Sequence, residues 1–120
     1  MVPNIDALRD LQGSVYAGSR AFVVTAAGDG KHDHASRPEE ATDYVARVFD
    51  PGCAIIEDPV TGSAHCALAP FWSAKMGGKT KLNGYQASER GGKVRTSILG
   101  GGRVRLQGPA VTVFAGMMFV

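Results

Sequence analysis

The residues with the clearest chemical potential lie in one short stretch, positions 57–65, which reads Glu-Asp-Pro-Val-Thr-Gly-Ser-Ala-His. Thr61 and Ser63 are residue types that favour a helix start, where their side-chain oxygens can accept hydrogen bonds from unpaired N–H groups. Gly62 has no Cβ and lets a ligand approach the backbone closely. Because free N–H groups and the helix dipole attract negative charge, we predict a site for a carboxylate or phosphate. The alternative is an ordinary capped helix.

Asp58 precedes this helix start and is the first candidate for a functional acid. A carboxylate beside a helix N-terminus is suited to hydrogen bonding with a substrate, although it could also serve only as a cap. His65 and Cys66 invite a nucleophile–base reading, but helix neighbours point about 100° apart and do not meet. We therefore expect Cys66 to be a small buried side chain and His65 to be packed or hydrogen-bonded.

The strongest predicted helix covers residues 64–76, where apolar side chains recur at helical spacing. They are Ala64, Ala67, Leu68, Phe71 and Trp72. The apolar face is wide, so we expect the helix to be buried. Gly77 and Gly78 then supply its end.

Strands are predicted on both sides of this helix from β-branched and aromatic content and from glycine turns. Residues 21–26 read as a buried strand, residues 39–49 fit either a strand or a helical turn, and residues 5–11 read as a short helix. An antiparallel meander is expected after the long helix. Its strands fall at residues 81–88, 93–99, 103–107 and 110–120. One long helix with several strands predicts an α+β domain.

Composition sets limits on the class of protein. A chain of 120 residues has the length of a single domain, and its net charge of +2 is too small to suggest nucleic-acid binding. No apolar run reaches the ~18 residues that span a membrane, and no signal peptide is evident. Cys53 and Cys66 lack metal-site spacing, so we expect reduced thiols in a cytoplasmic protein. His32 and His34 are weak evidence for a metal, and a solvated loop is the expectation there.

Three blocks of the sequence resemble the phenazine biosynthesis-like (PhzF-type) proteins of the diaminopimelate-epimerase-like superfamily. The blocks are residues 43–52, 57–66 and 85–92. The resemblance implies two similar domains, each an antiparallel or mixed β-sheet curled around one central helix, with the active site between them. Residues 1–120 are similar to the second domain alone, without the strand that normally opens it. The chain is then half of a longer enzyme, a truncated form of it, or a stand-alone half-protein.

The resemblance also implies roles at the helix start. In phenazine-type members, the residues matching Asp58 and Ser63 contribute to the substrate site, and we carry catalytic roles onto these two alone. Gly62, Ser63 and Ala64 follow as substrate-binding residues, with Gly62 and Ala64 acting through their backbones. Epimerases of the superfamily use a cysteine pair, and Ser63 and Ala64 stand here where such a thiol is expected. The family's proton-moving glutamate belongs to the first domain, and its local motif is absent from this sequence.

These inferences predict the substrate-anion-binding half of an isomerase that acts on a small carboxylate. We expect no metal, no cofactor and little activity from the chain alone, because acid–base catalysis needs a group within reach of the moving proton. The alternative is a non-enzymatic interaction or assembly domain. An exposed sheet edge and the apolar run at residues 110–120 predict a homodimer or higher oligomer. Gln86 and residues 90–92 read as a tight strand connection. The residues leave open the substrate and the roles of His65, of Arg90 and of the loop that carries His32 and His34.

Overall fold

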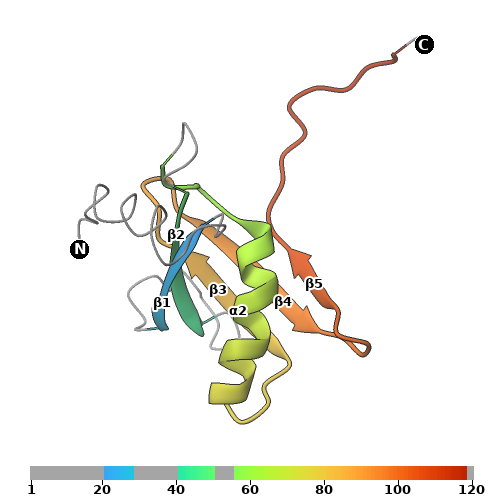
Figure 1. Cartoon of the computed structure of the whole chain (residues 1–120). Coiled ribbons are helices and arrows are strands. Elements are labelled where there is room, and N and C mark those ends of the chain that lie inside the picture. Colours follow the sequence, from blue (N-terminus) through green and yellow to red (C-terminus); the bar gives the residue numbers. More distant parts are fainter. Residues whose placement is uncertain (1–20, 29–40, 51–55, 119–120) are drawn as a thin grey trace.

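A computed structural model describes residues 21–28, 41–50 and 56–118. In this part of the chain, one helix, α2 (Gly62–Lys75), lies against a five-stranded mixed sheet, as expected for an α+β domain (Figure 1). The strands follow one another across the sheet in chain order. They are β1 (Phe22–Ala27), β2 (Tyr44–Phe49), β3 (Lys81–Gln86), β4 (Gly92–Ile98) and β5 (Val104–Gln107). The helix predicted at residues 5–11 falls outside the described residues, as do Cys53, His32 and His34.

The sheet combines one parallel pair with three antiparallel pairs. Strand β2 runs antiparallel to β1 and parallel to β3, while β3, β4 and β5 form the predicted antiparallel meander. A parallel pair needs a crossover connection, and α2 provides it between β2 and β3. Residues 39–49 fitted either a strand or a helical turn by sequence, and the structure shows a strand over Tyr44–Phe49.

Alternation along the strands directs one face of the sheet toward α2. Leu82, Gly84 and Gln86 are buried on β3, and Val94 and Thr96 are buried on β4, at every second position. This is the side-chain period of a β-strand with one covered face. The intervening positions point to the other face, and three exposed arginines lie on or beside β4 and β5. They are Arg95, Arg103 and Arg105.

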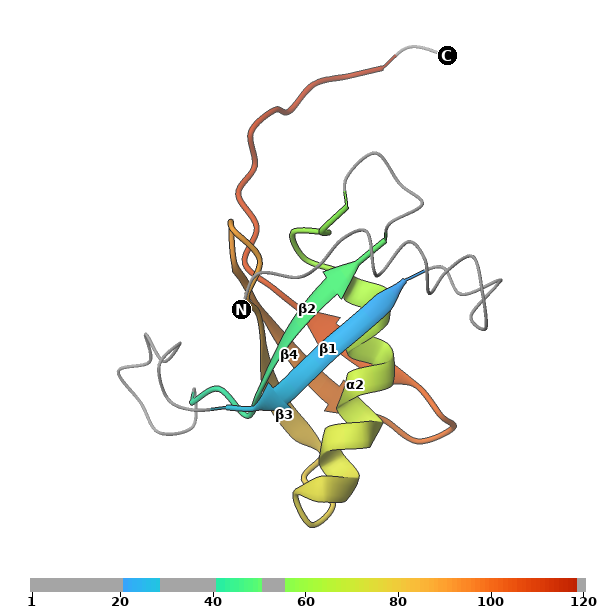
Figure 2. The same ribbon diagram turned by 60° about the vertical axis from the view of Figure 1, so that its left-hand side comes forward.

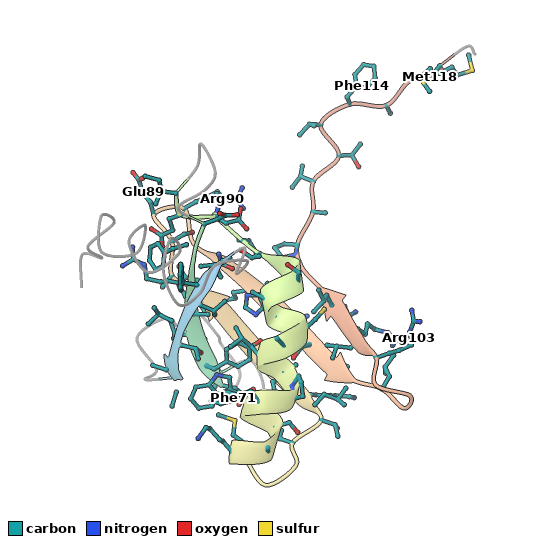
Figure 3. The ribbon with its side chains drawn as sticks, in the orientation of Figure 1. Phe71, Glu89, Arg90, Arg103, Phe114 and Met118 are labelled. Carbon is teal, nitrogen blue, oxygen red and sulfur yellow. The ribbon has the colours of Figure 1, made fainter. Side chains whose placement is uncertain are left out.

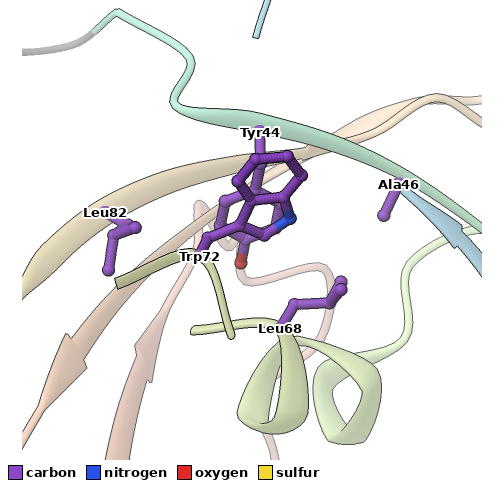
Figure 4. Packing of buried hydrophobic residues seen from close by; sticks show 5 residues of the cluster. All are labelled: Tyr44, Ala46, Leu68, Trp72 and Leu82. Carbon is purple, nitrogen blue, oxygen red and sulfur yellow. The ribbon is translucent and has the colours of Figure 1, made fainter. Parts of the chain in front are cut away.

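The core lies between α2 and the sheet. Tyr44 on β2 and Trp72 on α2 stack with ring centroids 6.1 Å apart and an interplanar angle of 5°. Leu68, Leu82 and Ala46 complete the cluster around the two rings (Figure 4). Aromatic side chains bury large areas and gain from stacking, so this pair joins the helix to the sheet.

Helix α2 begins two residues before the predicted start and ends one residue before the predicted end. The backbone N–H of Met76 closes it on the carbonyls of Trp72 and Ser73. Gly77 and Gly78 follow with φ of 66° and 85°. Only glycine adopts this left-handed region readily, so the predicted stop is confirmed.

The prediction that α2 is buried all round is wrong for the described structure. Leu68 and Trp72 are buried, but Ala67 and Cys66 are exposed and Phe71 keeps 48% of its surface accessible (Figure 3). Cys66 is therefore a free, exposed cysteine and not the small buried side chain expected. The physical reason is that the sheet covers only one side of the helix.

Strand β1 is present, but its predicted burial is also wrong. Val23 and Val24 are 41% and 56% exposed. The strand lies at the edge of the sheet and pairs only with β2 in the described structure. Its inward contact comes from the Thr25 hydroxyl, which donates to the Val45 carbonyl at 2.8 Å and accepts from Trp72 Nε1 at 2.9 Å.

The apolar strand predicted at residues 110–120 is not found where the structure describes this run. Residues 110–118 have no strand assignment, and they leave the end of β5 and extend away from the domain (Figure 2). Apolar and β-branched composition favours a strand only where another strand offers hydrogen-bond partners. Large apolar side chains therefore remain accessible, including Val113 at 94% and Phe114 at 85%.

We predict that Gly84→Ala destabilises the domain by roughly 1–3 kcal/mol, because overpacking a tight core forces side chains to shift. A Cβ at Gly84 would lie 2.6 Å from Cζ of the buried Tyr44 ring. Gly100→Ala is the matched control, since a Cβ there meets nothing within 4 Å. Urea denaturation measures both changes, and equal stability of the two variants would contradict this packing account.

Candidate functional site

The segment before α2 is held against the end of β2 by backbone hydrogen bonds. The Asp50 N–H donates to the Ile56 carbonyl at 2.8 Å, and the Asp58 N–H donates to the Val48 carbonyl at 3.0 Å. Phe49 and Glu57 form an antiparallel bridge between these two bonds. The backbone of Asp58 is therefore tied to the sheet before the helix begins.

The buried Gln86 amide holds the same segment from the end of β3. Its Oε1 accepts from the Thr61 N–H at 2.8 Å, and its Nε2 donates to the Asp58 carbonyl at 2.6 Å. Nε2 also donates to Thr61 Oγ1 at 3.2 Å. Because two partners are backbone groups of fixed polarity, they determine which end of the amide is oxygen. Nearby, the Ser88 hydroxyl donates to the Pro59 carbonyl at 2.7 Å.

The Asp58 carboxylate faces a side chain and not the helix backbone. Its Oδ2 accepts a short hydrogen bond from the Thr61 hydroxyl. Thr61 occupies the residue before the first helical position, with extended φ and ψ of −105° and 97°, yet makes no side-chain capping bond. The expectation that the Thr61 side chain caps α2 is therefore wrong: its oxygen accepts from Gln86 Nε2 and its proton goes to Asp58, while no N–H of the first turn bonds to it. No capping bond from Asp58 is found among the described residues either.

The first turn of α2 presents backbone donors beside this carboxylate. Gly62 and Ser63 are exposed and Ala64 is half-buried. The first helical hydrogen bond runs from the His65 N–H to the Thr61 carbonyl, at 3.4 Å. In the described part of the chain, the N–H groups of Gly62, Ser63 and Ala64 have no acceptor. The sequence-predicted residues are thus brought together at one helix end, where orphan N–H groups suit an anion.

His65 lies behind this turn in a buried polar contact. It is fully buried, and its Nδ1 shares a 2.8 Å hydrogen bond with the Tyr44 hydroxyl, which confirms the prediction that it is packed and hydrogen-bonded. Burial lowers the pKa of His65, while the neighbouring Gln86 side chain acts in the opposite direction. Burial also raises the pKa of Tyr44 to about 12. Nε2 of His65 has no hydrogen-bond partner in the described structure.

Charged side chains surround the outer rim of the site. Arg47 donates two hydrogen bonds to Glu57, from Nε to Oε1 at 2.7 Å and from Nη2 to Oε2 at 2.8 Å. A pairing of this fork geometry fixes Glu57 beside Asp58. An open hollow of about 870 Å³ lies next to it, and Figure 3 shows Glu89 and Arg90 at this end of the domain. The hollow is lined by Glu57, Pro59, Ser88, Glu89 and Arg90.

No group of three or more His, Cys, Asp or Glu side chains in the described part of the chain is placed to hold a metal ion. No helix in it is both long enough and apolar enough to cross a membrane.

Comparison with known proteins identifies the family. A family model described as Phenazine biosynthesis-like protein matches residues 7–116. The chain belongs to the phenazine biosynthesis-like family. The crystal structure of a Clostridium difficile protein described as a phenazine biosynthesis PhzC/PhzF protein superposes with a TM-score of 0.75 at 35% identity. That match covers 100% of this chain and 39% of the other.

Curated relatives of this family member give the same picture of a partial match. An uncharacterized isomerase from Halalkalibacterium halodurans is 49% identical over 59% of this chain and 26% of its own length. The phenazine biosynthesis-like domain-containing protein of Pongo abelii is 42% identical over 68% of this chain and 28% of its own. An uncharacterized isomerase from Pseudomonas aeruginosa is 41% identical over 81% of this chain and 32% of its own. This chain therefore spans about a third or less of each of these relatives.

Sequence reasoning found the helix start but missed the side chain that ties it down. At Gln86 the sequence predicts only a tight strand connection. Its partners Thr61 and Asp58 lie 25 and 28 residues away in the chain. Gln86 lies in the third block of the family resemblance, residues 85–92. No local pattern in the sequence shows which distant carbonyl and N–H groups its amide will contact.

We predict that His65 makes stability fall as the solution becomes acidic. Its pKa is lower in the folded state than the unfolded value of about 6.5, so the unfolded chain binds the extra proton first. The free energy of unfolding is then highest above about pH 6.5 and declines below it. Urea denaturation at several pH values measures this slope. His65→Asn, compared in a background with His32 and His34 also changed to Asn, is expected to remove it. An unchanged slope would contradict the assignment.

Proposed function

We propose that this domain is the substrate-anion-binding half of a PhzF-like isomerase that moves a proton on a small carboxylate substrate. One observation carries the proposal: the unpaired N–H groups of Gly62, Ser63 and Ala64 lie beside the Asp58 carboxylate. The isomerase names of the bacterial relatives support the reaction class.

The chemistry divides between an anion cradle and a hydrogen-bonding side chain. The N–H groups of the first turn, together with the positive end of the helix dipole, favour a substrate carboxylate. The exposed Ser63 hydroxyl can donate a further hydrogen bond. Asp58 has Oδ2 occupied by Thr61, which leaves Oδ1 to accept from a hydroxyl or amino group of the substrate. These contacts orient a substrate for proton transfer.

The proton transfer itself needs a general acid–base group opposite this surface. We propose that the chain represents the second of two domains, since it spans only 39% of the superposed crystal structure. The other domain of such a protein would carry the catalytic glutamate that the resemblance implies. A cytoplasmic location remains part of this proposal.

The cradle is tested by following backbone amide shifts during titration with sulfate and small carboxylic acids. We expect the largest shifts at Gly62, Ser63 and Ala64. Gly62→Pro removes one N–H at a helix position that tolerates proline, and Thr61 already has the extended backbone that proline requires before it. This variant should bind about tenfold more weakly, because a charge-assisted hydrogen bond is lost.

Gly62→Ala is the matched control, because it keeps the N–H and its Cβ meets only Leu106 Cδ1, at 3.4 Å. It should bind like the unchanged protein. Shifts that map elsewhere, or equal losses in both variants, would reduce the cradle to a plain helix start. Isomerase turnover by these 120 residues alone, abolished by Asp58→Ala, would show instead that the site is complete without a first domain.

A second candidate function is assembly, favoured by the exposed apolar segment after β5. Val111, Val113, Phe114, Met117 and Met118 are each at least 85% exposed. Soluble monomers seldom expose this much apolar surface, and Phe71 on α2 is a further exposed apolar side chain, separate from this segment. We propose that two copies associate through these surfaces as a homodimer about a two-fold axis.

Light scattering at micromolar concentration measures this association. We expect a mass of at least twice the 12.6 kDa of one chain. Val113→Asp with Phe114→Asp should shift the mass toward the monomer, because charge opposes apolar burial. A clean monomer mass for the unchanged protein would contradict assembly without affecting the anion site.

A further inference from the structure

We propose that Gln86 is a positioning residue that sets the place and the hydrogen-bond direction of Asp58 beside the start of α2. The proposal deepens the function proposed above and rests on it. Gln86 is fully buried at the end of β3, and its amide meets both ends of the segment that carries the site. No other described side chain bonds to both Asp58 and Thr61.

The three hydrogen bonds of the amide have a defined polarity. Nε2 donates to the Asp58 carbonyl and to Thr61 Oγ1, and Oε1 accepts from the Thr61 N–H. A hydroxyl group has a single proton, so Thr61 Oγ1, which accepts from Gln86, turns that proton toward Asp58 Oδ2. The sequence of donors runs from Gln86 through Thr61 to Asp58. The amide therefore fixes both the backbone and the carboxylate of Asp58.

The fold provides a closely fitted place for this side chain. Gln86 is the register neighbour of Ala46 on β2, and both are buried. From this position the amide reaches the segment before α2. A buried amide that satisfies both of its ends costs little, whereas one unsatisfied end carries a full desolvation penalty. The Gln86 amide is therefore stabilised at this position by its hydrogen bonds to Asp58 and Thr61, and not by packing alone.

The segment has other attachments besides the amide and the backbone bonds to β2. The Ser88 hydroxyl donates to the Pro59 carbonyl and accepts from the Gly91 N–H at 3.1 Å. This contact holds the middle of the segment independently of the amide. Loss of the Gln86 contacts should therefore misplace Asp58 and Thr61 while the chain stays folded.

Gln86→Glu is the most selective change, because it preserves shape and the acceptor for the Thr61 N–H but replaces the donor by a carboxylate oxygen. That oxygen would face the Asp58 carbonyl and would draw the Thr61 hydroxyl away from Asp58. Gln107→Glu is the matched control: it makes the same chemical change at an exposed position on β5. Folding of each variant is checked by its amide spectrum before binding is measured.

We expect sulfate affinity to fall on the order of tenfold in Q86E and to stay unchanged in Q107E, because only Q86E releases the residues just before the N–H groups and adds a negative charge beside them. The difference in sulfate affinity between Q86E and Q107E should become smaller as the pH is lowered from about 8 to about 5. A buried carboxyl protonates well above its usual range and then offers a donor again. A residue with a purely structural role would change the unfolding midpoint without changing the affinity of the folded protein.

Changes at Thr61 separate the effect from the added charge. Thr61→Val removes the hydroxyl link with no charge change and should weaken sulfate binding as Q86E does, while Thr61→Ser should restore it. If sulfate does not bind the unchanged protein, the anion site fails, yet the positioning role is still read from the Thr61 and Asp58 amide shifts and their hydrogen exchange. Q86E spectra and affinities that match those of Q107E would overturn the role of Gln86.

Discussion

The packing of the Tyr44 ring is the contact on which the rest of this domain depends. The ring comes from β2, lies over Gly84 on the parallel neighbour β3, and stacks on Trp72 of α2. Its hydroxyl shares a hydrogen bond with His65. A single buried side chain therefore joins the two parallel strands to the helix that connects them. The position of the helix start relative to the sheet follows from this contact, since His65 lies in its first turn.

The segment that carries the candidate site is anchored on two sides. Backbone bonds from β2 and side chains from the end of β3 and the following turn hold the residues before α2. Groups that must meet a ligand in a fixed geometry benefit from this, because the cost of ordering them is met during folding. Asp58 and the N–H groups of the first turn thus face outward from a fixed frame. In the described structure this segment is held by several hydrogen bonds, unlike an ordinary surface loop.

The same domain leaves apolar surface uncovered. Phe71 on α2 and the segment after β5 expose side chains that a folded protein normally buries. The relatives that this chain matches are more than twice its length, by the numbers of residues and the shares that the matches cover. The two proposed functions have a common physical basis, because a second domain or a second chain could cover this surface and also supply groups to the proposed site. Burial of these apolar side chains would be favoured by the hydrophobic effect, which does not require specific pairs of residues.

The sequence by itself determined α2, the strands of the meander and the motif at the helix start, because these depend on local periodicity, glycine turns and residue types within a few positions. Only the tertiary structure decided that Cys66 is exposed, that β1 is an open edge and that residues 110–118 form no strand, since burial and strand pairing depend on distant neighbours. It also decided that the Thr61 hydroxyl serves Asp58 and that Gln86 holds both. A hydrogen bond between residues far apart in the chain has no local signature, because the fold alone brings its two groups together.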